Sequence, residues 1–478
     1  DPAADRDTIL RIMDRMERWL KCRPSHRCKR WVRPEGAVAI GWTGPDSAAS
    51  AWEESPQERG HVILVDGELY MDEHALNGPR CVNVFQRIWN QRGASLLQGL
   101  AQAEGTFHAA VWDEGPRELT LISDHFGSRP LYFASRSGRL IFAHQVQGIL
   151  ASGCVQQERD LDGLAAFLFM GSPLGDRTLL REVNLLPAAS LFSFRDGRGT
   201  PTSYWRLTDL FEGEEDSTKV AADTIEAAFR QSIARGLSGE ARKGLLLSAG
   251  LDTRVNLAGA VHCGGLIHSF TYGIPGCVDM VIAEKMARDA GVSHHSFELR
   301  PDFLLRHADE IVRMTDGMLN LVHSSGISTF EEIAAHADVL LVGNGGEFSR
   351  GYYHRGDAIR GGQWLIPGLM GLLQKGFMLE EAPLPLNGDL SRLLASRIRP
   401  VLEEVVEGMV QMPVLDLLDA FYLRERFRKF SVSGLALKRN YFECRTPLMD
   451  LSFLMAVGRA PRTMRGRWSP IHRLLIQR

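Results

Sequence analysis

In the second half of the chain, short runs of apolar residues alternate with segments in which apolar residues recur at helical spacing. Short apolar runs are typical of buried parallel strands, and their alternation with helices is typical of a doubly wound α/β sheet. The pattern predicts strands at Leu245–Leu247, Leu266–Tyr272, His294–Glu298 and Asp338–Val342, and helices at Thr218–Leu237, Thr253–Ala260, Asp279–Ala290 and Phe303–Arg313.

The first half shows short strands between polar or Gly-containing turns, which is typical of a layered α+β domain. A helical pattern at Arg11–Leu20 is followed by loops and short strands over Cys28–Gly60. Asp66-Gly67 is typical of a turn, so we expect a turn there between two flanks with strand character. Further along, the pattern predicts helices at Val82–Asn90 and Ala94–Ala103, and strands at Thr106–Trp112, Leu119–Ser123, Leu131–Ala134 and Leu140–Ala143.

The length of 478 residues exceeds what one hydrophobic core usually serves, so two domains are expected. The change of pattern puts their boundary near Leu207–Glu212, and we assign residues 1–208 to the α+β domain and 209–478 to the α/β domain.

The charge balance is nearly even, with 55 basic and 58 acidic residues and a formal charge of −3, which does not favour nucleic acid or an anionic membrane as a partner. Apolar runs such as Leu164–Met170 are too short to span a bilayer, and no signal peptide opens the chain, so we expect a cytoplasmic protein. Seven cysteines without CxxC spacing argue against a disulfide framework and a zinc cluster.

Candidate chemistry lies where the first predicted strand of the α/β domain ends. Leu245–Leu247 leads into the small residues of Ser248–Gly250 and then into a helix with Asp252 near its start. Small residues let the backbone approach a ligand, and the first amides of a helix bind anions, so a phosphate group is expected there. The carboxylate of Asp252 suits Mg²⁺. A structural explanation also exists, because an acid near a helix start is favoured by the helix dipole.

The stretch SAGLDT (Ser248–Thr253) resembles the SGGxDS loop of ATP pyrophosphatase (PP-loop) enzymes, which cleave ATP to AMP and pyrophosphate. GNGGEFSRGYY (Gly343–Tyr353) resembles GEGSDEIFGGY of the asparagine synthetase family, and YFECRTPLMD (Tyr441–Asp450) resembles its LEVRVPFLD. Asp279 stands where these synthetases have an acid, with helix capping as the alternative. The resemblance implies Asp252 and Glu347 as Mg²⁺ ligands and catalytic residues, and Leu247, Ser248, Ala249, Gly250, Asp252, Thr253, Tyr272, Gly343 and Gly345 as ATP-binding residues.

The last segment, GRWSPIHRLLI, resembles the part of the family that carries a lysine for the adenylation transition state, but Ser469 stands at that position. The missing cation would come from Arg467, which we assign as catalytic, or from Lys438. Asn344 stands where β-lactam synthetases have a tyrosine that activates the substrate. Three arginines follow Glu347: Arg350, Arg355 and Arg360. They either bind an anionic substrate or form a solvated loop face.

Three stretches of the first half resemble the N-terminal (Ntn) glutaminase domain of the same family: VDGELY (Val65–Tyr70), GTFHAAVWD (Gly105–Asp113) and DHFGSRPLYFA (Asp124–Ala134). In the family, a cysteine at the mature N-terminus is the nucleophile and its own amino group is the base. Here the chain begins with Asp1, and Asp66 replaces the Asn that helps form the oxyanion hole beside Gly67. The resemblance therefore implies a degenerate glutaminase domain that hydrolyses no glutamine.

The implied fold is an Ntn-like α+β domain followed by a PP-loop α/β domain with extra C-terminal helices. The implied reaction is adenylation of a carboxylate by MgATP, release of pyrophosphate and attack of an amine to give an amide and AMP. The expected substrate is a small molecule or peptide with a carboxylate and an amine, as in β-lactam synthetases and lasso-peptide cyclases, in natural-product or polysaccharide biosynthesis; a homodimer is left open. The alternatives are a glutamine-dependent asparagine synthetase-like amidotransferase, if a cysteine upstream of Asp1 was trimmed, and a non-catalytic nucleotide-binding scaffold.

Overall fold

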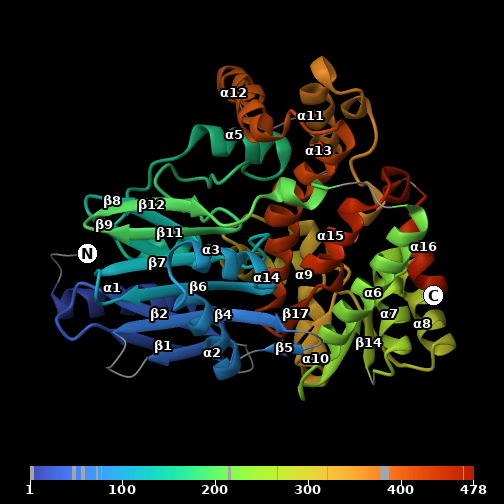
Figure 1. Ribbon diagram of the computed structural model, residues 1–478, viewed down its shortest axis with the longest axis horizontal. Coiled ribbons are helices and arrows are strands. Elements are labelled where there is room, and N and C mark those ends of the chain that lie inside the picture. Colours follow the sequence, from blue (N-terminus) through green and yellow to red (C-terminus); the bar gives the residue numbers. More distant parts are fainter. Residues whose placement is uncertain are drawn as a thin grey trace.

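The computed structural model of the protein describes residues 5–45, 50–54, 60–71, 74–76, 78–213, 217–265, 267–319, 321–376, 387–466 and 468–478. The first half of the chain forms a β-rich region at the left of Figure 1, and the second half forms an α/β region at the right. The predicted fold class is confirmed: a layered α+β part precedes a parallel α/β part.

Seven strands of the first half form an antiparallel sheet in the order β12-β11-β7-β6-β4-β3, with β5 paired to β4. Side chains alternate between its faces, so Ile63 and Val65 pack with Phe85 of α2, while Leu64 packs on the opposite side. A three-stranded sheet, β10-β8-β9, and a hairpin, β1-β2, complete this region. Its strands are β1 (Arg27–Val32), β2 (Ala39–Gly44), β3 (Ser50–Glu54), β4 (His61–Met71), β5 (His74–Leu76), β6 (Gly105–Asp113), β7 (Glu118–Ser123), β8 (Tyr132–Arg136), β9 (Arg139–Ala143), β10 (Asn184–Leu185), β11 (Ser190–Arg195) and β12 (Arg198–Ser203).

Helix α1 (Arg6–Leu20) opens the described chain, and its start is capped by Asp5, whose carboxylate accepts a hydrogen bond from Thr8 N at 2.7 Å. Its apolar face is buried against α4 and β2. The other helices of this region are α2 (Gly78–Trp89), α3 (Gly93–Gln102), α4 (Val146–Ala151) and α5 (Leu161–Met170).

The predicted turn at Asp66-Gly67 is wrong, because β4 runs straight through it and pairs with β6 on both sides. Gly67 has φ +121°, and a Cβ atom there would lie closer than 3.0 Å to the Thr106 carbonyl oxygen. The glycine therefore marks a close approach of two strands, which is a common reason for glycine inside a strand.

The second half contains a wholly parallel five-stranded sheet in the order β15-β14-β13-β16-β17. Leu245, Leu340 and Leu341 on its inner strands are fully buried, because helices cover both faces; this explains the continuous apolar runs. Strand β17, close to the C-terminal end, was not predicted as a strand. The sheet consists of β13 (Lys243–Leu246), β14 (His268–Gly273), β15 (Ser293–Glu298), β16 (Val339–Leu341) and β17 (Glu443–Arg445), with helices α6 (Thr218–Leu237), α7 (Leu251–His262), α8 (Val278–Asp289), α9 (Phe303–Thr315) and α10 (Ile327–His336).

The remaining C-terminal helices pack on the helices around this sheet, on β17 through α14, and on α5 of the first half through α11 and α12. Helix α12 lies beside α5 at the top of Figure 1, where Arg397 donates to Asp162 at 2.8 Å. These helices are α11 (Leu365–Gly376), α12 (Gly388–Val406), α13 (Val414–Phe421), the π-helix η7 (Tyr422–Ser431), α14 (Val432–Lys438), α15 (Leu451–Arg459) and α16 (Pro470–Gln477).

Ion pairs join the two halves, including a buried pair of Arg129 with Glu443 at 2.6 Å and a partly exposed pair of Arg428 with Asp176 at 2.6 Å. The predicted domain boundary falls within the short 3-10 helix η1 (Leu207–Phe211), and the division into 1–208 and 209–478 stays a prediction. All seven cysteines are free thiols. Among the described residues, no helix has both the length and the apolar character needed to cross a membrane.

Candidate functional site

Two loops meet at the carboxyl edge of the parallel sheet, where ligands of open α/β sheets usually bind. One loop follows β13 and the other follows β16, its neighbour in the sheet. A Cβ atom on Gly343 would lie 3.0 Å from the Asp252 Cβ, and one on Gly346 would lie closer than 3.0 Å to Asp252 Oδ1. Glycine is therefore required at these positions for the second loop to reach Asp252.

The first loop is held in shape by its own side chains and by α8. Thr253 Oγ1 accepts a hydrogen bond from Ser248 N at 3.1 Å, and Asp279 Oδ1 accepts one from Ala249 N at 2.8 Å. The N-cap of α8 is Cys277, so Asp279 supports the loop across the sheet edge rather than capping its own helix. A helix leaves its first-turn amides without intrahelical partners, so those of α7 are of the kind that can bind an anion.

Asp252 binds two nitrogen donors that are far away in the sequence. Arg350 Nη2 lies 3.1 Å from Asp252 Oδ2, and His472 Nε2 lies 2.8 Å from Asp252 Oδ1. His472 is fully buried on α16, whereas the Arg350 side chain is 34% exposed. Sequence reasoning missed His472, although it lies within GRWSPIHRLLI, the stretch that was compared with the family's lysine segment.

The other candidate cations are arranged differently. Lys438 Nζ donates to the Gly434 carbonyl of its own helix at 3.4 Å, and burial lowers its pKa. Arg467 lies outside the described residues, so its catalytic role stays a prediction. Ser469 adopts a left-handed conformation directly before α16. The structure therefore brings Arg350 and His472, rather than Lys438, into contact with the predicted metal ligand.

Glu347 binds a tyrosine that the sequence did not point to. Tyr422 Oη donates to Glu347 Oε2 at 2.7 Å from the start of the π-helix η7, and π-helical turns are frequent at functional sites. Burial and the negative charges of Glu347 and Asp252 raise the pKa of Tyr422 well above its ordinary value. Both predicted metal ligands therefore lie within electrostatic range of one buried hydroxyl group.

The two carboxylates fit a Mg²⁺ ion that is shared with phosphate, since this ion usually takes one or two carboxylates together with substrate phosphates and water. Within the described parts of the chain, no three His, Cys, Asp or Glu side chains are arranged to hold a metal by themselves. The hard oxygen atoms of Asp252 and Glu347 supply the protein's part of such a site, and ligands from phosphate and water would complete it.

The remaining predicted residues have mixed positions. Leu247 is 3% exposed in the core, and Tyr272 packs with its ring edge against Phe330, so both make core contacts while their predicted ATP contacts stay untested. Arg355 and Arg360 are exposed and stack on rings of their own loop, Tyr352 and Trp364, at 4.8 and 4.0 Å. Of the three arginines after Glu347, Arg350 is the one that enters the site.

Asp66, at the position that the resemblance assigns to the oxyanion hole, forms hydrogen bonds and ion pairs through its side chain. Asp66 accepts hydrogen bonds from Trp42 Nε1 at 2.9 Å and from Arg129 Nη1 at 3.2 Å, and Arg129 also binds Glu443 across the two halves. Burial opposes ionisation of Asp66, but Arg129 and His108 outweigh it and lower the pKa to about 2. An ionised carboxylate accepts hydrogen bonds and cannot donate them.

Comparisons with known proteins find a matching family model in each half of the chain. Residues 65–205 match the model of the glutamine amidotransferase domain, and residues 224–468 match that of asparagine synthase. The chain is 22% identical over 269 residues to asparagine synthetase [glutamine-hydrolyzing] 2 of Bacillus subtilis, covering 51% of this chain and 36% of the relative. Asparagine synthetase [glutamine-hydrolyzing] 3 of the same organism is 26% identical over 343 residues, covering 64% and 54%.

A third relative, asparagine synthetase B [glutamine-hydrolyzing] of Escherichia coli, is 22% identical over 264 residues, which cover 50% of this chain and 42% of the relative. The chain therefore spans between about a third and about half of the length of these relatives. The asparagine synthase model covers more than half of the chain, and its range includes all five strands of the parallel sheet. The chain thus belongs to the asparagine synthase family.

Proposed function

We propose that this chain is an ATP-dependent carbon–nitrogen ligase that adenylates a carboxylate, releases pyrophosphate and joins the acyl group to an amine, with AMP as the second product. The observation that carries the proposal is the meeting of two glycine-containing loops, one with Asp252 and the other with Glu347, at the carboxyl ends of β13 and β16. Such an edge, with a helix N-terminus and two carboxylates, suits a triphosphate.

The groups around Asp252 have different roles in this reaction. The first amides of α7 bind the phosphates that leave as pyrophosphate. Arg350, being partly exposed, is free to exchange its contact with Asp252 for one with a phosphate, and this stabilises the charge that develops on the leaving group. His472, being fully buried, keeps the carboxylate of Asp252 oriented. Mg²⁺, when bound by Asp252, Glu347 and the phosphates, supplies charge neutralisation.

The amine in this proposal comes from the substrate and not from glutamine. Asp66, as an ionised and paired carboxylate, does not provide the hydrogen-bond donor that an oxyanion needs. A peptide or small molecule that carries both a carboxylate and an amine therefore fits best, as in peptide macrocyclisation or another amide-forming step of natural-product or polysaccharide biosynthesis.

One observation favours a second candidate, a nucleotide-binding scaffold without catalysis. Both oxygens of Asp252 already bind nitrogen donors of the protein, so a metal ion must compete with Arg350 and His472. In a scaffold these contacts would persist when ATP binds.

ATP–pyrophosphate exchange distinguishes the candidates. The exchange rate is measured for the native protein, Asp252→Asn and Asp289→Asn. Each protein is tested with a panel of peptides and amino acids that carry a carboxylate and an amine. Asp289 is a matched control, because it is an exposed acid that pairs with Lys285 on α8. We expect exchange in the native protein and the control, and at least a hundredfold loss in Asp252→Asn. ATP binding without exchange across the panel supports the scaffold, and glutamate released from glutamine supports an amidotransferase.

A further inference from the structure

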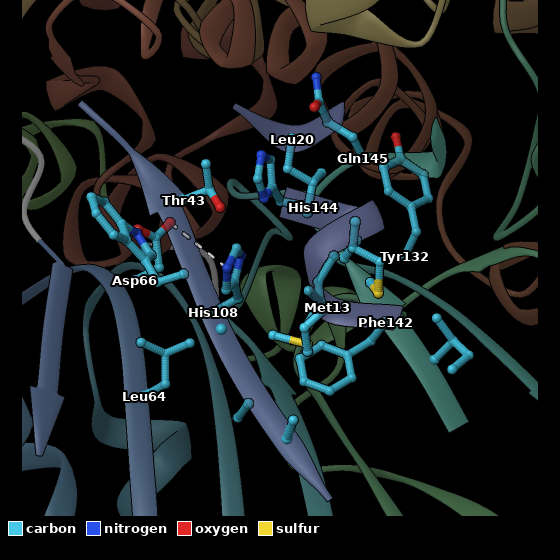
Figure 2. Close-up of a pocket in the computed structure, with 18 of the residues that line it drawn as sticks. Met13, Leu20, Thr43, Leu64, Asp66, His108, Tyr132, Phe142, His144 and Gln145 are labelled. Carbon is cyan, nitrogen blue, oxygen red and sulfur yellow. Dashed lines mark hydrogen bonds and ion pairs between the residues drawn. The ribbon is translucent and has the colours of Figure 1, made fainter. Parts of the chain in front are cut away.

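A cavity of about 410 Å³ lies in the first half, between β2, β4 and β6 on one side and α1 and β9 on the other. Figure 2 shows Leu64, Met13 and Phe142 around its apolar part, and Asp66, His108 and His144 around its polar part. Its volume is that of a pocket for a small molecule. Residues of the second half, including Ala436 of α14, complete its wall, so it lies between the two halves of the chain.

Helix α1 makes much of the cavity apolar. Ile9, Ile12, Met16 and Leu20 form its buried face, and all four line the cavity. Leu64 and Ala110 of the sheet also line the cavity, so both the helix and the sheet contribute apolar side chains to its wall. An apolar wall of this size favours a ligand that gains free energy by leaving water.

Three imidazoles are among the polar groups that line the cavity: His26, His108 and His144. His26 and His108 are 3% and 9% exposed, and the Nδ1 atom of each is buried without a hydrogen-bond partner among the described residues. Burial lowers the pKa of both, and it lowers the pKa of His144 to about 4. Neutral imidazoles each offer one donor and one acceptor, and a buried polar atom without a partner is costly.

Two carboxylates and two guanidinium groups at the polar end of the cavity compensate one another. Asp66 binds Trp42 and Arg129, while Glu443 binds Arg129 and Arg439. A zwitterion such as free glutamine would add two charges beside a network whose two carboxylates and two guanidinium groups already balance, and burying extra charge without a full partner is unfavourable. A neutral ligand avoids this cost.

We propose that this cavity is a binding site for a neutral, largely apolar small molecule with one or two hydrogen-bonding groups, such as a hydroxyl or an amide. The apolar body lies against α1, Leu64 and Phe142, and the polar group binds the imidazoles of His108 and His144. The degenerate glutaminase fold thus holds a ligand instead of hydrolysing one. This inference does not depend on the proposed ATP chemistry.

Two dyes with the same type of aromatic skeleton test it on the native protein. N-phenyl-1-naphthylamine is neutral, and 1-anilinonaphthalene-8-sulfonate is anionic. We expect saturable binding of one neutral dye per chain, measured by its increase in fluorescence, and at least tenfold weaker binding of the anionic dye. Millimolar glutamine should not displace the neutral dye. Equal affinity for the two dyes, or the absence of saturable binding, overturns the proposal.

Variants with larger side chains in the cavity test whether the neutral dye binds there. Ala110→Leu on β6 and Ala436→Leu on α14 add volume to opposite walls, and Ala258→Leu on the outer side of α7 is the matched control. We expect the dissociation constant of the neutral dye to rise at least tenfold in the first two and to stay unchanged in the third, with melting curves as a check of folding. Unchanged dye affinity in a folded, filled variant contradicts the proposal. If Ala110→Leu does not fold, Ala436→Leu and the comparison of the two dyes still test the proposed binding site.

Discussion

Arg445 and Glu68 form an ion pair with two hydrogen bonds, buried between the two halves of the chain. Arg445 Nε lies 2.8 Å from Glu68 Oε2, and Arg445 Nη2 lies 2.7 Å from Oε1, with side-chain exposures of 4% and 1%. Arg445 Nη1 also donates to the Gly236 and Ser238 carbonyl groups at 2.9 Å. The guanidinium group therefore joins β4, β17 and the end of α6.

Glu68→Gln should destabilise the protein strongly, because it leaves the buried charge of Arg445 without its partner. We expect the free energy of unfolding to fall by about 3–5 kcal/mol. Urea titration followed by circular dichroism measures it. Asp289→Asn is the control, since its pair with Lys285 is exposed and such pairs contribute at most about 1 kcal/mol. Equal small effects of the two substitutions would show that the buried pair does not stabilise the interface.

Asp66 predicts a pH-dependent part of the stability. Its pKa is lowered from 3.8 to about 2 in the folded state, so its contribution is fully present above about pH 4 and is lost as the pH falls towards 2. We expect Asp66→Asn to cost about 2 kcal/mol at pH 7 and little at pH 2. Melting temperatures of the native protein and the variant, measured between pH 7 and pH 2, test this. A difference that stays constant over that range is the contrary result.

Gly346→Ala should damage the nucleotide site more than the fold, because its Cβ would collide with Asp252 Oδ1 and push the two loops apart. We expect at least a tenfold loss of ATP–pyrophosphate exchange, and a stability loss of about 1–3 kcal/mol from overpacking. Gly371→Ala is the matched control: its Cβ would meet nothing within 4 Å, and in a helix alanine is favoured by about 0.5–1 kcal/mol. Full exchange activity in Gly346→Ala would show that ATP–pyrophosphate exchange does not depend on the close approach of the two loops.

Much of the fold follows from local patterns along the chain. Helix α6 begins and ends at the predicted residues, Thr218 and Leu237, and the four predicted strands of the parallel sheet are all present within a few residues. The exceptions have physical causes. The turn expected at Asp66-Gly67 is absent because Gly67 allows two strands to approach closely there. Strand β17 was missed because two of its three residues, Glu443 and Arg445, are charged, so no apolar run marks it.

The candidate site was predictable in its carboxylates but not in their partners. Asp252 and Glu347 stand in recognisable loops, whereas Arg350, Tyr422 and His472 reach them from 98, 75 and 220 residues away. Nothing in the local sequence fixes such pairings, since they depend on how the C-terminal helices fold back over the sheet edge. Family resemblance pointed to a lysine position, Ser469, whereas the basic groups that contact Asp252 are His472, on the helix that follows Ser469, and Arg350, in the loop of Glu347.

Calorimetric titration of a non-hydrolysable ATP analogue tests the central claim, that Asp252 and Glu347 hold MgATP, most directly. The titrations compare the native protein, Glu347→Gln and the control Glu284→Gln, an exposed acid paired with Arg288, each with and without Mg²⁺. The account predicts that Mg²⁺ strengthens binding in the native protein and the control, and that Glu347→Gln weakens Mg²⁺-dependent binding at least tenfold while leaving metal-free binding unchanged. Equal Mg²⁺-dependent affinity in all three proteins would contradict it.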